Sequence, residues 1–154
     1  MTGVDVSILS LLEGSLPKST FASGEKPAVS YFDYVIDGVA LRPLLATENI
    51  GVLSNEWDSV ELARHLLGEG SISHRIEDRA LIYGCAVCLD VECGGITAEI
   101  TRVGNHIRWD KIETFEIDWG GDCSAAYTPT NIGPFTFDYE QYRAALAPFL
   151  AAPK

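Results

Sequence analysis

The strongest constraint on the fold is a Gly104-Asn105 dipeptide between two segments that alternate apolar and polar residues, together spanning Gly95 to Trp109. Glycine at the first position of a two-residue turn suits a type II′ β-hairpin. This turn predicts four cross-strand pairs: Ile100–Trp109, Arg102–Ile107, Glu99–Asp110 and Thr101–Arg108. The alternation slips from Lys111 onward, which predicts a β-bulge before Phe115, Ile117 and Trp119.

A second hairpin is predicted from Val29 to Leu41, because Asp37-Gly38 is a dipeptide typical of a type I′ turn. Ile36 would then face Val39, Tyr34 would face Leu41, and Asp33 would lie opposite Arg42 on the other face. Pro43 would end the second strand, since proline cannot donate to a ladder. A short apolar run, Ile50 to Leu53, predicts a further strand.

Two helices are predicted. The first spans 58–67, with Asp58 as N-cap, Trp57 and Leu62 as a hydrophobic staple, and Gly68 as the stop. Its buried stripe would be Leu62, Ala63, Leu66 and Leu67, with Arg64 and His65 facing water. The second spans 138–150, with Asp138 as N-cap, Gln141 completing a capping box, Phe137 and Tyr142 as a staple, and Pro148 ending or kinking the helix.

These elements predict one α+β domain over residues 28–152. Its antiparallel sheet of β-hairpins would come from 29–42 and 79–119, and the two main helices would pack on that sheet. The chain has 154 residues, of which 47% are hydrophobic, and this is enough to form one core without a disulfide or a metal ion to stabilise it. Residues 1–27 are predicted to be a poorly defined N-terminal segment, with a short helix at Val4 to Leu12 followed by a loop to Gly24.

The charge of the chain limits its partners. The formal net charge is −11, from 22 acidic and 11 basic residues. Such a charge disfavours binding to nucleic acid or to an anionic membrane, and is compatible with a basic protein partner or simply with a solvated surface. There is no apolar run long enough to span a membrane and no basic segment typical of a secretory signal. We therefore expect a cytoplasmic protein, in which clustered thiols stay reduced or bind metal.

The cysteines are the main candidates for chemistry. Cys85 and Cys88 have a C-x2-C spacing, Cys93 follows before Gly94-Gly95, and Cys123 lies further along the chain. This spacing lets two thiolates converge on a tetrahedral ion, so the predicted metal ligands are Cys85, Cys88, Cys93 and Cys123, and zinc is the candidate cofactor. His74 and His106 are alternative fourth ligands.

A structural reading competes with the metal site. Cys85 and Cys88 have opposite parity, so a continuing strand would point them to opposite faces, where cysteine packs as a small hydrophobic residue. A thioredoxin-like redox role is disfavoured, because no helix that would lower a thiol pKa is predicted after this C-x2-C.

Other sites are less marked. The sequence contains no signature of a serine hydrolase, P-loop, zinc protease or dinucleotide-binding fold, and no catalytic residue is assigned. His65, His74 and His106 are expected at the surface, and Trp109 and Trp119 in the core. An acidic run supplies the predicted partner-binding residues, Glu113, Glu116, Asp118 and Asp122, although a solvated rim would have the same composition.

Three segments together resemble a known family. They are Cys85-Ala86-Val87-Cys88 through Thr97, the hairpin ending in Ile107-Arg108-Trp109, and Ile132-Gly133-Pro134-Phe135-Thr136-Phe137-Asp138. They resemble a family of small acidic bacterial proteins with a C-x2-C…C-G core and a G-P-F-x-F-D segment before the last helix. The resemblance covers about residues 80 to 150, its pattern does not include the fourth cysteine, and it implies the architecture rather than an activity.

Two functions follow as hypotheses. The first is a non-enzymatic acidic interaction module, such as an immunity or accessory factor that binds a basic bacterial partner. It is favoured by the net charge and by the lack of catalytic signatures. The alternative is a small oxidoreductase or metal-dependent enzyme that uses the cysteine cluster.

Overall fold

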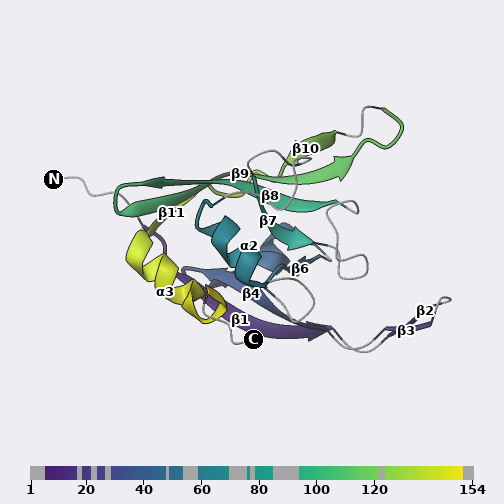
Figure 1. Cartoon of the computed structure of the whole chain (residues 1–154), viewed down its shortest axis with the longest axis horizontal. Coiled ribbons are helices and arrows are strands. Elements are labelled where there is room, and N and C mark those ends of the chain that lie inside the picture. The colour runs from purple at the N-terminus through teal and green to yellow at the C-terminus, as the bar shows by residue number, and fades with distance from the viewer. Residues whose placement is uncertain are drawn as a thin grey trace.

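The computed structural model describes residues 6–16, 19–21, 24–26, 29–47, 49–53, 59–69, 76, 79–84, 94–121 and 124–150. For residues 15, 16, 19–21, 24–26, 29 and 59 it describes the backbone alone. These residues form two facing antiparallel sheets with helices between and beside them (Figure 1). The α+β class predicted from the sequence is confirmed.

The larger sheet, called the large sheet below, contains the two longest of the described strands. Its order is β10 (Ala125–Pro129), β9 (His106–Ile117), β8 (Gly95–Val103), β7 (Ala80–Gly84) and β6 (Ile50–Gly51), and β11 (Phe135–Asp138) also pairs with β9. The predicted hairpin register is confirmed in full, since all four expected pairs are present between β8 and β9. The predicted bulge is confirmed too: the register shifts between Thr97 and Glu99, opposite Lys111, whose φ is +49°.

The small sheet has the order β1 (Leu9–Leu16), β4 (Val29–Ile36) and β5 (Val39–Ala40). The Asp37-Gly38 hairpin is confirmed, with Ile36 opposite Val39. The helix predicted at Val4 to Leu12 is wrong, because Leu9–Leu16 pairs as a strand along the whole of β4. The loop predicted up to Gly24 is also wrong, because β2 (Ser19–Phe21) and β3 (Gly24–Lys26) form a separate two-stranded hairpin.

The segment that connects β5 of the small sheet to β6 of the large sheet begins with a short helix, α1 (Leu41–Leu45). The prediction that Pro43 ends a strand is therefore wrong: β5 ends at Ala40, and Pro43 lies in the first turn of α1, where no intrahelical N–H is needed. Asp33 is buried and accepts hydrogen bonds from the backbone N–H groups of Tyr34 (2.8 Å) and Arg42 (3.2 Å) and from the Tyr83 hydroxyl. This carboxylate fixes the start of α1 against the small sheet.

The second helix, α2 (Ser59–Leu66), lies between the two sheets (Figure 1). The predicted stripe of Leu62, Ala63, Leu66 and Leu67 is buried, and Gly68 follows with a φ of +87°. The Trp57–Asp58 cap lies outside the described residues. The expectation that His65 faces water is wrong, since it is only 5% exposed. The helix packs against both β7 and α3, so it is covered on more than one side and a polar residue beside the apolar stripe is also buried.

The last helix, α3 (Tyr139–Leu150), begins as predicted: the Asp138 carboxylate accepts a hydrogen bond from the Gln141 N–H at 3.0 Å. The capping box is not completed, however, because the side chain of Gln141 bonds to Leu9 of β1 instead. The predicted staple is present, with the rings of Phe137 and Tyr142 5.1 Å apart. The helix does not end at Pro148, and continues to Leu150.

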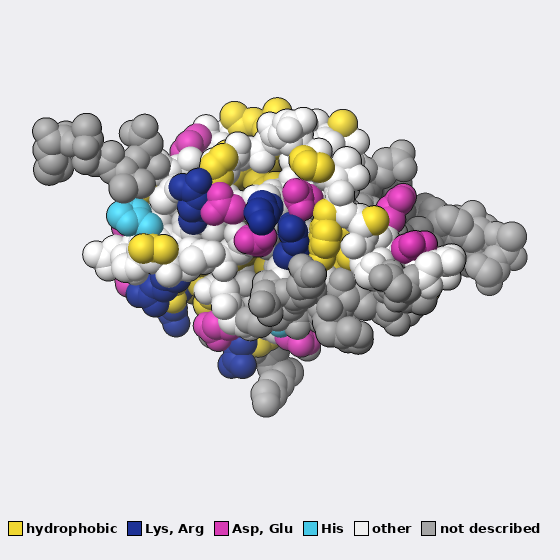
Figure 2. Space-filling view, turned by 90° about the horizontal axis from the view of Figure 1, so that it is seen from above, with side chains coloured by type: hydrophobic (Ala, Val, Ile, Leu, Met, Phe, Trp, Pro, Cys, Tyr) yellow, Lys and Arg dark blue, Asp and Glu magenta, His cyan; other side chains and the backbone are white. Residues whose placement is uncertain are grey.

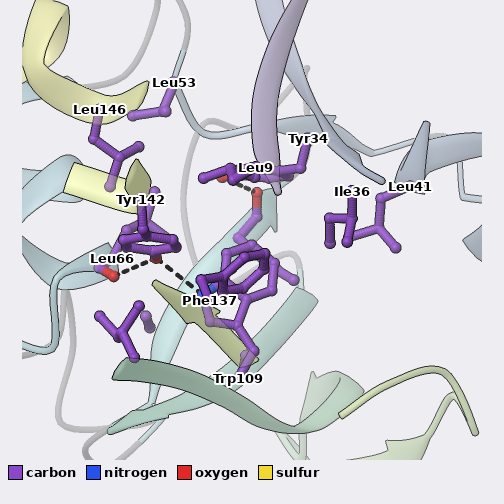
Figure 3. Close-up of a cluster of buried hydrophobic side chains, with 14 of the residues drawn as sticks. Leu9, Tyr34, Ile36, Leu41, Leu53, Leu66, Trp109, Phe137, Tyr142 and Leu146 are labelled. Carbon is purple, nitrogen blue, oxygen red and sulfur yellow. Dashed lines mark hydrogen bonds between the residues drawn. The ribbon is translucent and has the colours of Figure 1, made fainter. Parts of the chain in front are cut away.

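The core between the sheets is built from aromatic side chains that carry satisfied polar ends (Figure 3). Trp109 donates its indole N–H to the Tyr142 hydroxyl at 2.9 Å, and that hydroxyl donates to the Leu66 carbonyl. Tyr34 donates to the Ile82 carbonyl at 2.9 Å. Burial raises the pKa of each of the tyrosines Tyr34, Tyr83 and Tyr142 above the usual range. These phenols therefore stay neutral and act as hydrogen-bonding core residues.

Two further expectations concern exposure. Trp109 is fully buried, as predicted, but Trp119 is 52% exposed, so the prediction that it lies in the core is wrong. Trp119 follows the end of β9 and lies in a turn. None of the described helices is both long and apolar enough to cross a membrane.

Candidate interaction site

The predicted acidic residues lie in different surroundings. Glu113 on β9 forms an ion pair with Arg79. The Nη2 atom of Arg79 lies 2.9 Å from the Glu113 carboxylate and 3.6 Å from that of Glu99. The same guanidinium donates to the Lys111 carbonyl at 3.2 Å and lies 4.0 Å from the ring centroid of Tyr127. Both the Arg79 and Glu113 side chains are largely buried, at 10% and 16% exposure. Glu113 is therefore part of a local charge network.

The face of the large sheet that carries this network mixes both signs of charge. Lys111 lies 3.2 Å from the carboxylate of Glu99, and Arg108 lies 2.8 Å from that of Asp110. Figure 2 views this face and shows basic and acidic side chains interspersed over it. Interspersed charges cancel at a distance, so this face does not present a uniformly acidic surface.

The other acidic residues lie elsewhere. Glu116 has the opposite parity to Glu113 on β9, and lines a hollow of about 360 Å³ together with Thr47, Asn49 and Thr128. Asp118 is exposed in the turn after β9, where its N–H donates to the Ser124 carbonyl at 2.9 Å. Asp122 lies outside the described residues. The structure therefore does not gather Glu113, Glu116 and Asp118 on one surface, and their role in binding stays a prediction.

All four predicted metal ligands, Cys85, Cys88, Cys93 and Cys123, lie outside the described residues, as does His74. Among the residues that are described, no group of three or more His, Cys, Asp or Glu side chains is arranged to hold a metal ion. His106 is half-buried at the start of β9.

The strand ends that flank the cysteines in sequence do share one place in the fold. Gly84 at the end of β7 pairs with Gly95 at the start of β8. Ser124, just before β10, bonds to Asp118, just after β9. Because these four strands are consecutive neighbours and antiparallel, all of these ends lie at the same end of the large sheet.

A separate apolar groove lies between β1 and α3. Its volume is about 530 Å³. Most of its lining is apolar: Leu9, Leu11, Phe32, Ala144, Ala145, Pro148 and Phe149, joined by Ser10 and Gln141. The rings of Phe32 and Phe149 meet edge to face at the groove, 5.0 Å apart, and hold α3 against the small sheet.

The strand beside the groove is the edge of the small sheet, since among the described strands β1 pairs with β4 alone. The free edge is closed at Leu9, whose N–H donates to Gln141 Oε1 (3.1 Å) and whose carbonyl accepts from Gln141 Nε2 (2.7 Å). Gln141 thus bonds to Leu9 as a neighbouring strand would. Past Leu9, no described residue bonds to the outward backbone groups of Leu11 and Glu13 on this edge.

Glu13 places a carboxylate at this open edge. Glu13 is exposed and pairs across the sheet with Phe32, so its side chain extends from the same face as Leu11. No described cation forms an ion pair with Glu13. An apolar groove, an open strand edge and an acidic side chain therefore adjoin one another.

Sequence reasoning missed this site because it assigned β1 to a helix. Val4, Ile8, Leu11 and Leu12 match a helical spacing, but Leu9 and Leu11 also alternate with Ser10, which is the two-residue period of a strand. That alternation was the available signal. The partner α3 joins β1 only through tertiary contacts, so the groove itself had no local signature.

Comparisons with protein-family models, with curated proteins and with solved structures find no match to this chain.

Proposed function

We propose that this chain is a non-enzymatic protein-interaction module that binds a segment of a basic partner protein in the groove between β1 and α3. The observation that carries the proposal is the apolar groove beside an open strand edge. A protein surface gains affinity where a partner side chain is fully desolvated in such a hollow, with polar groups around it to fix orientation.

The charge of the chain supports the choice of a basic partner. With a net charge of −11, long-range attraction raises the association rate of a positively charged protein. This attraction is screened by salt, since the Debye length falls from about 30 Å at 0.01 M to about 3 Å at 1 M. Affinity should then reside in the groove, while the rate of encounter depends on charge.

The test is a selection of unstructured peptides from a random display library on the full chain. Ala144→Trp places a large side chain in the groove, and Ala147→Trp is the matched control, because Ala147 is exposed on the same helix but does not line the groove. We expect selected peptides to be rich in Lys or Arg with one large apolar residue. They should bind the control variant as well as the unchanged chain, and lose binding to Ala144→Trp.

Two results would reject the proposal. One is a selection that yields no binding peptide. The other is a set of peptides that bind Ala144→Trp as tightly as the unchanged chain, which would place the interaction outside the groove.

A second proposal concerns the cysteines, and a specific placement favours it: the strand ends next to Cys85, Cys93 and Cys123 lie at one end of the large sheet. We propose that these residues, with Cys88, hold a structural zinc ion that ties the strand ends together. Thiolates that leave neighbouring strand ends can meet at one tetrahedral ion. Such an ion would stabilise the fold because the unfolded chain presents no formed site.

Elemental analysis of protein purified without chelators tests this second proposal, with about one zinc per chain expected. Chelation should lower the thermal midpoint without unfolding the chain completely, because apolar and aromatic side chains form an extensive core between the sheets. Cys88→Ser should reproduce the shift. Metal-free protein of unchanged stability would show that the thiols have no ligand role.

A further inference from the structure

We propose that the partner segment binds as an additional antiparallel strand on β1, with a Lys or Arg opposite Glu13 and a large apolar residue opposite Leu11. This inference rests on the proposed function and specifies its mode of recognition. Strand addition to a sheet edge combines backbone hydrogen bonds, which give affinity, with side-chain pockets, which give specificity.

The direction of the backbone groups on β1 supports this mode. In an antiparallel ladder, successive residues alternate between facing the neighbouring strand and facing away from it. Leu9 faces away from β4, since Gln141 bonds both its N–H and its carbonyl. Ile8 faces inward, since its carbonyl accepts from the Asp37 N–H at 3.0 Å. Leu11 and Glu13 therefore present their N–H and carbonyl groups outward.

A contact on β4 gives the same register independently. Phe32 lies opposite Glu13, and its N–H donates away from β1, to the Leu53 carbonyl at 2.9 Å. When one member of a cross-strand pair points its groups away from the partner, the other member does so too. The Gln141 contact at Leu9 and the Leu53 contact at Phe32 thus both indicate that the backbone groups of Glu13 point away from β4.

Gln141 sets where the added strand must end. It already bonds the outward groups of Leu9, so a partner strand can pair with Leu11 and Glu13 but not with Leu9. Leu11 also lines the groove, and a residue directly opposite it projects its side chain from the same face of the sheet. That side chain would lie over the groove between Leu11 and α3.

The recognised sequence follows from the antiparallel direction. Because β1 runs from Leu11 to Glu13, the partner residue opposite Glu13 precedes the one opposite Leu11 by two positions. The motif is therefore Lys or Arg, then any residue, then a large apolar residue, read from the amino end. Opposite charges directly across a strand pair stabilise it, and Glu13 has no competing described cation.

The experiment uses the full chain and three short acetylated, amidated peptides with uncharged flanks. The first carries Lys-Thr-Phe, the second is N-methylated at Phe and the third is N-methylated at Thr. The Phe amide would donate to the Leu11 carbonyl, so its methylation should weaken binding about ten-fold or more. The Thr amide faces solvent, and its methylation should leave the affinity unchanged.

A charge exchange tests the contact with Glu13. A Glu-Thr-Phe peptide should bind the unchanged chain weakly and recover affinity on Glu13→Lys. Glu116→Lys is the control, because it makes the same change of net charge far from the edge of β1. Recovery on Glu13→Lys alone supports the pairing, and equal recovery on both variants would overturn it.

The remaining outcomes distinguish antiparallel strand addition from the proposal that the groove binds a partner segment. Equal loss on methylation of Phe and Thr, no loss on either, or equal binding of a reversed Phe-Thr-Lys peptide would overturn antiparallel strand addition. If the Lys-Thr-Phe peptide nevertheless bound the unchanged chain and lost its binding to Ala144→Trp, the proposal of groove binding would remain supported. If no peptide with the motif bound and the library also yielded none, both proposals would fail.

Discussion

The side-chain amide of Gln141 forms two hydrogen bonds with the backbone of Leu9, at 3.1 Å and 2.7 Å, across 132 positions of sequence. One amide group thereby joins the last helix to the first described strand. The same contact closes part of a strand edge and leaves the rest of it open. Gln141 thus contributes both to the contact between α3 and β1 and to the position of the candidate site.

Gln141→Leu should destabilise the chain. It leaves the N–H and carbonyl of buried Leu9 without their side-chain partner, which should cost about 1–3 kcal/mol. Arg143→Ala, an exposed change on the same helix, should stay within about 0.5 kcal/mol. Urea unfolding of the two variants measures the difference. Equal stability of both would mean that water replaces the amide without loss.

Tyr142→Phe should cost more than a usual tyrosine truncation. The hydroxyl accepts from Trp109 at 2.9 Å and donates to the Leu66 carbonyl, so its removal leaves two buried polar groups unsatisfied (Figure 3). We expect a loss of about 2–5 kcal/mol. The control is Tyr139→Phe, whose ring lies half-buried under Arg102. Thermal unfolding followed by tryptophan fluorescence should rank the two variants in this order.

Stability should fall at alkaline pH. Burial raises the pKa of each of the tyrosines Tyr34, Tyr83 and Tyr142, whereas in the unfolded chain each titrates near its usual value of about 10. Above about pH 10 the unfolded state therefore binds fewer protons than the folded state, and the free energy of unfolding decreases as pH rises. Their contribution is fully present below that pH.

The slope of this decrease is measurable. Each buried tyrosine contributes up to about 1.4 kcal/mol per pH unit above its unfolded-state pKa. Urea unfolding between pH 8 and about pH 11 should show this decrease in the free energy of unfolding. Tyr142→Phe should reduce its slope against pH by the contribution of one tyrosine. A free energy of unfolding that stays constant across this range would contradict the burial of these phenols.

Arg79→Met should destabilise the chain by about 1–3 kcal/mol, because it leaves the largely buried Glu113 carboxylate without its cation. Arg108→Met is the matched control, since the ion pair of Arg108 with Asp110 is exposed and should contribute about 0–1 kcal/mol. Adding Glu113→Leu to Arg79→Met should recover much of the loss. Denaturant midpoints of the three variants provide the test.

The sequence by itself determined the elements whose geometry is local. The Gly104-Asn105 turn and the alternation on either side specified the register of β8 with β9, and the slip at Lys111 located the bulge. The Asp138 cap set the start of α3. A turn type and a side-chain parity fix these features over a few residues, so no distant contact is needed to predict them.

Only the tertiary structure decided which surfaces these elements present. β1 is a strand because β4 pairs along it, although its apolar spacing also matched a helix. His65 is buried because α2 packs against both β7 and α3, and Glu113 forms an ion pair with Arg79, which lies 34 positions earlier in the chain. The groove exists because α3 packs beside an edge strand 132 positions earlier in the chain. Local sequence cannot encode such contacts, since their free energy arises only when distant segments meet.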